Sequence, residues 1–401
     1  MMTSRERVAK VLNHEMPDRI PNCLGGCETA GLHILAYSKL VDILGLPKRP
    51  VRIDTFMFNA VMDEDVLLKM NGDMLLLASP LMCRRPLRAQ AGWNETSLFG
   101  IPVLLTDNYA LEEDPDGRIW LLDEGRRGPC CPKGGLYFDN PPKGDLFDDS
   151  EVPDPKNYHP SHELPETLLR SLEETAKNAY ESTDFALCMG ETLTDLQLMP
   201  GGMIAWYEAM LNEPEIIHEY LGKAVEAALD QLKMLDQAIG KYCQVLSIAH
   251  DLGDQKGVTI GAELFRELYK PHYTDYFQGW HKLTDMKVNL HSCGSVAEII
   301  PDLIECGVDI LNPVQLSAAG MSAKEVRRLA GDQLVLYGGA LDCILTPAAS
   351  DPEFVYQQVR ENIQALSEGG NYLFAGVHNT VANTPAEHLK AMLDAYEDCC
   401  R

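Results

Sequence analysis

A histidine and a cysteine, His291 and Cys293, lie two residues apart in the stretch KVNLHSCGSVAEII, where a short apolar run ends and a helical pattern begins. On extended backbone, side chains at positions i and i+2 point to the same side, roughly 6–7 Å apart. Both could then reach one ion between them, since Zn–N bonds are about 2.0 Å and Zn–S bonds about 2.3 Å. The pair indicates a metal site, although an H-x-C element on its own more often reflects chance and packing.

A second histidine, His378, follows the last expected strand and could face the same opening. The three side chains would supply one sulfur and two nitrogen ligands and leave a fourth position open, as a catalytic zinc requires. Taken alone, His378 would be interpreted as a core or loop histidine.

Other polar residues also stand at or just past the ends of apolar runs. Turns favour Gly, Asn, Asp and Ser, so His and Cys at these positions favour function over turn chemistry. For the pair His250 and Asp251, a structural salt bridge is an equally good interpretation. The catalytic candidates are Asp251, Glu28 and Asp342, and the substrate-binding candidates are His250, Gln255, Glu191, Asn312 and Asn379.

The elements that must position these residues alternate regularly after Pro165. Six apolar strands are expected at 185–190, 244–249, 287–290, 308–312, 334–337 and 372–375, each followed or preceded by a helical pattern. Strands that are apolar on both faces are typical of parallel sheets covered by helices. With one or two more strands near the N-terminus, the count favours an α/β fold of the (β/α)8 TIM-barrel type, whose reactive groups occupy the C-terminal strand ends. No Gly-rich dinucleotide or phosphate fingerprint follows any strand, which disfavours a doubly wound sheet.

The pattern changes between about residues 82 and 155, where short alternating runs are separated by turn residues. We predict a small β-rich insertion there, and an N-terminal helical extension that opens with a capping box from Thr3 to Glu6. The whole chain, 1–401, is expected to form a single barrel domain.

Composition excludes several classes of protein. The 60 acidic and 34 basic residues give a net charge of −26, which argues against a nucleic-acid partner. No apolar run is long enough to span a membrane. The 12 cysteines are scattered and no export signal precedes them, so a reduced cytoplasmic setting is expected.

Beyond these local patterns, the chain resembles the uroporphyrinogen decarboxylase superfamily over nearly its whole length. The stretches that carry the resemblance are RERVAKVLNHEMPDRIP, DLGDQKG, HSCGSVAEIIPDLIECGVDILNPVQ, YGGALD and TPAEHLKAM. The H-x-C-G element is similar to that of the superfamily's zinc methyltransferases, which work with corrinoid proteins. This resemblance implies that His291 and Cys293 bind zinc, with a later cysteine as the third ligand.

At that third position this chain has His378 instead, in FAGVHNTVANTP. Two thiolates and one imidazole would make a zinc site formally neutral, whereas one thiolate and two imidazoles leave it at +1. A neutral site favours a nucleophilic bound thiolate, while a more positive ion is a stronger Lewis acid. The change suits polarisation of the oxygen or nitrogen of a methyl donor.

The resemblance therefore implies a corrinoid-dependent methyltransferase that moves a methyl group from a small O- or N-methylated donor, for example a methoxylated aromatic, to cobalt. The corrinoid would arrive on a partner protein, because no D-x-H-x-x-G element is present. Transfer from methylcorrinoid to a thiol, a metal-free decarboxylase and a non-enzymatic binding module remain open. Decarboxylases of the superfamily use basic residues near the first strand, and residues 22–38 contain no Arg or Lys. A homodimer is also possible.

Overall fold

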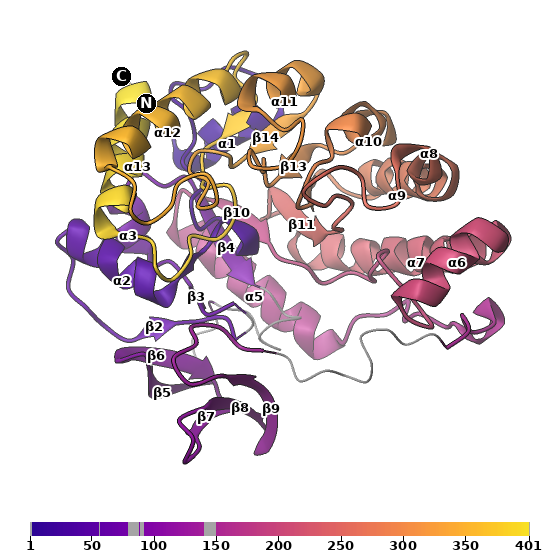
Figure 1. Cartoon of the computed structure of the whole chain (residues 1–401), viewed down its shortest axis with the longest axis horizontal. Helices are drawn as coiled ribbons and strands as arrows, with labels where there is room; N and C mark the ends of the chain where they lie inside the picture. Colours follow the sequence, from indigo (N-terminus) through magenta and orange to yellow (C-terminus); the bar gives the residue numbers. More distant parts are fainter. Residues whose placement is uncertain (1, 56, 79–87, 89–91, 140–149, 401) are drawn as a thin grey trace.

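A curled sheet of seven parallel strands forms the centre of the molecule, and helices cover its outside (Figure 1). The structure, a computed structural model, describes residues 2–55, 57–78, 88, 92–139 and 150–400. The strand order is β15-β14-β13-β12-β11-β10-β4. In chain order these strands are β4 (Met74–Ala78), β10 (Ala186–Met189), β11 (Val245–Ala249), β12 (Lys287–His291), β13 (Ile310–Asn312), β14 (Val335–Tyr337) and β15 (Tyr372–Leu373).

Residues 20–24 close this sheet into a barrel. Asn22 forms parallel bridges to Phe374, just after β15, and to Gly72, just before β4. The backbone N–H of Cys23 donates to the carbonyl of Phe374 at 2.8 Å, and that of Asp73 donates to the carbonyl of Asn22 at 2.7 Å. The segment thereby takes the eighth strand position, and the predicted α/β barrel class is confirmed.

The barrel strands are buried almost throughout, because side chains fill the barrel interior and helices cover its outer face. Every residue of β10, β13 and β14 is buried, and β12 is partly accessible only at Lys287. This burial on both faces explains why the strands appear in the sequence as continuous apolar runs. The side chains free to do chemistry are therefore those at the strand ends.

The helices follow the strands as the sequence pattern predicts. They are α1 (Ser4–Leu12), α2 (Ile34–Ile43), α3 (Glu64–Lys69), α5 (Glu166–Ser182), α6 (Met203–Asn212), α7 (Pro214–Leu235), α8 (Ala262–Leu264), α9 (Lys270–Leu283), α10 (Ile300–Cys306), α11 (Ala323–Ala330), α12 (Pro352–Leu366) and α13 (Ala386–Cys399). Between α8 and α9 the chain forms a π-helical turn, Phe265–Tyr269. None of the helices in the described ranges is long and apolar enough to cross a membrane.

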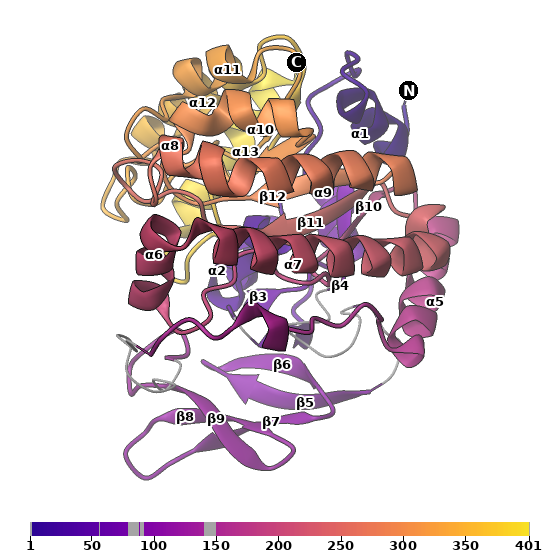
Figure 2. The same ribbon diagram turned by 90° about the vertical axis from the view of Figure 1, so that its right-hand side faces the viewer.

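Short antiparallel strands gather on one side of the molecule, below the barrel strands in the view of Figure 2. They are β5 (Trp93–Leu98), β6 (Ile101–Thr106), β7 (Tyr109–Glu113), β8 (Ile119–Asp123) and β9 (Arg126–Cys131). β6 also pairs with β2 (Val51–Arg52), while β1 (Leu32–His33) pairs with β3 (Asn59–Ala60). These five strands lie inside the range predicted to be β-rich. The division of the chain into one barrel domain and an insertion stays a prediction, and residue 82 lies outside the described residues.

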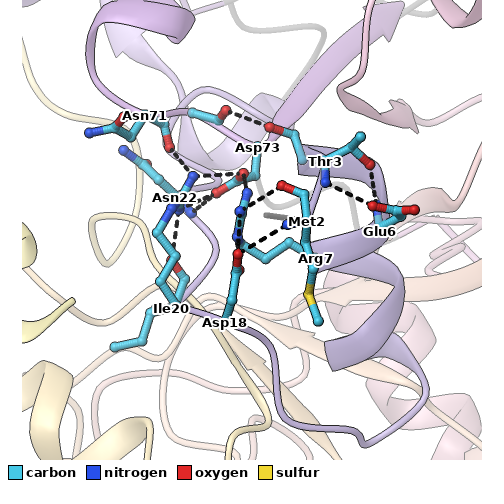
Figure 3. Close-up of polar contacts among 12 residues, drawn as sticks. Met2, Thr3, Glu6, Arg7, Asp18, Ile20, Asn22, Asn71 and Asp73 are labelled. Carbon is cyan, nitrogen blue, oxygen red and sulfur yellow. Dashed lines mark hydrogen bonds and ion pairs between the residues drawn. The ribbon is translucent and has the colours of Figure 1, made fainter. Parts of the chain in front are cut away.

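A group of ion pairs links α1 to the segment that closes the barrel (Figure 3). Its centre is Asp73, whose side chain is fully buried and accepts from Arg7 Nη1 at 2.7 Å and from Arg19 Nη1 at 2.6 Å. Asp73 also accepts the backbone N–H of Asn22 at 2.8 Å. The predicted capping box of α1 forms between Thr3 and Glu6. One buried carboxylate thus fixes both the N-terminal helix and the eighth strand position.

Candidate metal centre

Three side chains from two strand ends converge at one point of the barrel. His291 is the last residue of β12, Cys293 follows it, and His378 lies in the loop after β15. One ligand atom from each lies within 4.8 Å of the other two. The Cys293 Sγ is 3.3 Å from His291 Nε2, and the two imidazole centroids are 5.2 Å apart at an angle of 74°. Strands β12 and β15 are not adjacent in the sheet, so the curl of the barrel brings these residues together.

The spacing of the ligand atoms fits a small divalent ion. In a tetrahedral zinc site, bonds of about 2.0–2.3 Å place neighbouring ligand atoms about 3.3–3.6 Å apart. His291 Nε2 and Cys293 Sγ already have this separation. The ligand atom of His378 lies within 4.8 Å of the other two ligand atoms. To reach the zinc spacing it would have to move toward them by about 1 Å at most, which a side-chain rotation can supply.

Asn312 sets the tautomer of His291. The Asn312 Nδ2 donates to the Tyr337 carbonyl at 3.3 Å, so its Oδ1 is the atom that accepts from His291 Nδ1 at 2.9 Å. The hydroxyl of Thr29 donates to the same Oδ1 at 2.6 Å. With its proton on Nδ1, His291 turns the lone pair of Nε2 toward Cys293. Metal-bound histidines usually have such a partner on their other nitrogen.

His378 is held differently, because its Nδ1 accepts the backbone N–H of Asn379 at 2.8 Å. In the neutral ring the proton is then on Nε2. Coordination of an ion would require this ring to turn or its proton to move. Two of the three ligands are therefore already oriented for a metal, and the third needs a local adjustment.

Burial keeps both imidazoles neutral, as metal ligands must be. Desolvation, with a smaller contribution from His291, lowers the pKa of His378 to about 4. Desolvation also lowers the pKa of His291, against the opposing effects of Asn312 and Asp251. Burial and then Asp251 raise the pKa of the Cys293 thiol to about 12, so a bound cation would have to displace its proton.

The glycine of the H-x-C-G element is required by close packing of two loops. Gly294 has φ +80°, and a Cβ there would lie 2.4 Å from the backbone carbon of Gly253, in the loop after β11. The Gly294 N–H donates to Gln315 Oε1 at 2.7 Å. The turn therefore holds Cys293 against the neighbouring strand end, where Asp251 Oδ1 accepts the Cys293 N–H at 2.9 Å.

One acidic group, Asp251, stands beside the candidate ligands. Asp251 Oδ1 lies 3.7 Å from His291 Nε2, and the Asp251 side chain is 55% exposed. Burial, then Asp195 and Asp251, raises the pKa of Glu191 to about 7. Glu191 can therefore hold a proton near neutral pH.

His250, the residue directly after β11, is buried. Its Nδ1 is 2.8 Å from the Tyr273 hydroxyl, and its Nε2 is 3.9 Å from Asp195 Oδ1. Desolvation lowers the pKa of His250 to about 4, so the ring is neutral at pH 7. His250 therefore contacts the protein on both sides, and its role in substrate binding stays a prediction.

The remaining predicted residues occupy varied positions. Asp342 is buried and accepts backbone N–H groups of Ser317 at 3.0 Å and Ile344 at 2.8 Å, so it joins two strand-end loops. Glu28 is buried beside a cavity of about 20 Å³. Gln255 is exposed in the loop after β11. Their roles in catalysis or binding stay predictions.

A pocket of about 310 Å³ adjoins the metal-ligand group, because His378 and Asn379 form part of its lining. The other lining residues come from the segment 55–59, from the β-rich region at 129–138, and from Val381. Met57, Tyr137 and Phe138 were not predicted from the sequence as pocket residues. Tyr137 and Phe138 form an adjacent aromatic pair in the turn-rich stretch GLYFDN, whereas no local signal marks Met57.

The chain is similar to several solved structures, of which three follow. Among solved structures, a methyltransferase from Methanosarcina mazei is 16% identical, with a TM-score of 0.58 and 99% of each chain covered. A Listeria monocytogenes protein described as a vitamin-B12-independent methionine synthase is 13% identical, covers 54% of this chain and 65% of its own, and has a TM-score of 0.36. A family 5 glycoside hydrolase from Prevotella bryantii is 8% identical, with coverage of 59% and 78% and a TM-score of 0.33.

No curated protein matches the chain significantly. At 16% identity, the likeness to the Methanosarcina structure shows a shared fold over the full chain. The sequence model of the family described as uroporphyrinogen decarboxylase (URO-D) matches residues 131–399, which is well over half of the chain. The match includes β10 to β15 and all three candidate ligands, and on this basis the chain belongs to the uroporphyrinogen decarboxylase family.

Proposed function

We propose that the protein is the first methyltransferase of a corrinoid-dependent demethylating system. It would take a methyl group from a small O- or N-methylated donor and pass it to the cobalt of a separate corrinoid protein. The observation that carries the proposal is the convergence of His291, Cys293 and His378 at the barrel strand ends. The Methanosarcina structure that shares the fold is itself described as a methyltransferase.

His291, Cys293 and His378 would hold zinc. With one thiolate and two imidazoles the site would carry a formal charge of +1, and the ion would act as a Lewis acid on the heteroatom that loses the methyl group. Asn312 would keep His291 in the tautomer that presents Nε2. Cys293 would give up its thiol proton on loading.

The leaving heteroatom needs a proton or an orienting partner once the methyl group has gone. Glu191 supports such a role because its raised pKa, about 7, lets it hold a proton at neutral pH. Asp251 is the acid whose contacts place it beside the ligands, at 3.7 Å from His291 Nε2. Glu28 and Asp342 remain further candidates from the sequence.

Two features support the proposed cytoplasmic location and the lower rank of a decarboxylase. The described cysteines are all free thiols, which suits the proposed cytoplasmic location. Among the described residues that line the 310 Å³ pocket there is no Lys or Arg. A substrate with many carboxylates, as porphyrinogen decarboxylation requires, would find no cationic partner there, so we rank a metal-free decarboxylase lower.

Elemental analysis of the purified protein tests the metal centre. We expect about one zinc per chain in the wild type and its loss in His291→Ala and His378→Ala. His162→Ala is the matched control, because His162 is an exposed histidine that contacts Asp230 on the barrel surface. Zinc retained in both site variants would exclude the proposed centre.

Cobalt absorbance then tests the reaction. Reduced cobalamin mixed with the zinc-loaded protein and methylated donors should give the methylcobalamin spectrum. Demethylation of methylcobalamin by an added thiol, with no reaction from any donor, would contradict the proposed direction. The methyl group would then move from the corrinoid to the thiol. Decarboxylation of a porphyrinogen by the metal-free protein would contradict the proposal and identify a decarboxylase instead.

A further inference from the structure

We propose that Thr29 is a positioning residue of the metal centre and that the turn around it, Cys27–Gly31, holds both candidate histidine ligands. The inference rests on the proposed function, because it concerns the zinc ligands named there. The turn follows the segment that closes the barrel and contains the short 3-10 helix Glu28–Ala30. It contacts the strand ends that carry His291 and His378 through separate hydrogen bonds.

The first contact connects Thr29 to His291 through one amide. Thr29 Oγ1 donates to Asn312 Oδ1 at 2.6 Å, and the same oxygen accepts from His291 Nδ1 at 2.9 Å. The amide nitrogen of Asn312 faces the Tyr337 carbonyl at 3.3 Å, which accepts but cannot donate. Asn312 is fully buried, so the Thr29 hydroxyl is the second donor to an oxygen that bulk water does not reach.

The Thr29 hydroxyl stabilises the amide orientation that gives His291 its proton on Nδ1. A flipped amide would turn the Asn312 Nδ2 toward His291 Nδ1, which would then have to accept. The ring proton would move to Nε2, and no lone pair would face an ion. In that arrangement the Thr29 hydroxyl proton would be left with the Cys27 sulfur, a weak acceptor 3.5 Å away.

The second contact holds the His378 loop through the backbone. The Gly31 N–H donates to Asn379 Oδ1 at 2.9 Å, and the Gly31 carbonyl accepts the Thr380 N–H at 2.9 Å. The N–H of Asn379 in turn donates to His378 Nδ1 at 2.8 Å. The turn thus holds one imidazole through a side-chain hydroxyl and the other through main-chain groups, so a substitution of Thr29 separates the two effects.

Ligands that are held in place before an ion arrives lose less freedom when it binds. The two imidazoles, whose centroids are 5.2 Å apart, are both oriented by the Cys27–Gly31 turn. Direct hydrogen-bond partners of metal ligands change metal affinity about 10- to 100-fold. Thr29 acts through one further hydrogen bond, so its expected contribution is that of a single neutral hydrogen bond, about 2- to 12-fold.

Nitrogen NMR of metal-free protein labelled at histidine tests Thr29 without zinc or turnover. The chain has 11 histidines, and the signals of His291 are identified by their loss in His291→Gln. In the wild type we expect the His291 proton on Nδ1. Thr29→Val removes the hydroxyl and keeps the shape, so the signals should shift toward the Nε2–H tautomer. Thr29→Ala should give the same shift, and Thr29→Ser should restore the wild-type spectrum.

Asn379→Ala tests the contact to the His378 loop, because it removes the acceptor of the Gly31 N–H. The His378 signals should change and the tautomer of His291 should stay as in the wild type. A change at His291 alone would contradict the separate holding of the two imidazoles.

Zinc affinity, measured by competition with a chelating dye, should fall about 2- to 12-fold in Thr29→Val and stay near the wild-type value in Thr29→Ser. Thr274→Val is the matched control. Thr274 is also partly exposed, and its hydroxyl donates within α9 to the Lys270 carbonyl at 2.8 Å. The affinity of this control should equal that of the wild type.

An unchanged His291 tautomer in Thr29→Val and Thr29→Ala would overturn the inference, as would equal losses of zinc affinity in Thr29→Val and Thr274→Val. Failure of Thr29→Ser to restore the spectrum would assign the effect to side-chain shape instead. The two proposals fail separately. A tautomer that depends on Thr29 in a protein that binds no zinc would leave the positioning role standing and remove the proposed centre. Zinc binding and methyl transfer that are the same in Thr29→Val and the wild type would do the opposite.

Discussion

At the scale of single residues, the proposed metal centre depends on Asn312, which lies beside the candidate ligand His291. Its fully buried amide fixes the proton of His291 on Nδ1. In Asn312→Ala the imidazole loses this partner, and we expect zinc affinity to fall about 10- to 100-fold. Competition with a chelating dye measures the change.

Asn289→Ala provides the matched control for that variant. Asn289 is equally buried in β12, and its Nδ2 donates to Ser247 Oγ at 2.9 Å rather than to a candidate ligand. A similar loss of zinc affinity in both variants would assign the effect to the strand instead of the tautomer.

His250 gives the molecule a sensitivity to acid. Burial lowers its pKa from 6.5 to about 4, so the folded chain binds this proton more weakly than the unfolded chain does. Between pH 6.5 and 4 the unfolded state therefore gains protons, and stability falls as pH falls. The free energy of unfolding from denaturant titrations at pH 7 and pH 5 should differ less in His250→Asn, by on the order of 1–2 kcal/mol. An unchanged pH dependence in the variant would contradict this assignment.

At the scale of elements, Asp73 joins α1 to the segment that closes the barrel. Its carboxylate contacts Arg7 and Arg19, and the Arg7 side chain is only 5% exposed. Asp73→Asn removes the buried negative charge that Arg7 and Arg19 share, so we expect a loss of about 3–5 kcal/mol in the free energy of unfolding. Denaturant titration measures it.

Asp18→Asn should cost much less. The Asp18 side chain also contacts Arg7, but it is 33% exposed and water can replace part of the interaction. Equal losses in the free energy of unfolding from Asp73→Asn and Asp18→Asn would show that the burial of Asp73 does not determine how strongly these ion pairs stabilise the fold.

At the scale of the whole molecule, the net charge of −26 sets the response to salt. An excess of one charge destabilises the compact state by self-repulsion. The Debye length falls from about 30 Å at 0.01 M to about 10 Å at 0.1 M ionic strength, so added salt screens this repulsion. We expect Tm, measured by scanning calorimetry, to rise by a few degrees over that range. A Tm that stays constant or falls would show that local ion pairs dominate.

The sequence by itself determined the barrel and indicated which residues could form part of the proposed metal centre. Apolar runs alternating with helical periods predict parallel strands, because burial on both faces removes the polar alternation that other strands show. His291 and Cys293 could be paired from the sequence because two residues of extended backbone place their side chains on one side. His378 was predicted as the third ligand because it occupies the position at which the family that the chain resembles has a cysteine. Each of these inferences needs only local spacing or a resemblance along the chain.

Only the tertiary structure decided how distant segments meet. The contact between His291 and Asn312 depends on the register of β12 with β13, and the sequence pattern does not reveal it. The pocket joins Met57, Tyr137 and His378, which are far apart in sequence. Local periodicity contains no information about such contacts, because the closure of the barrel and the packing of the β-rich region against it set these distances.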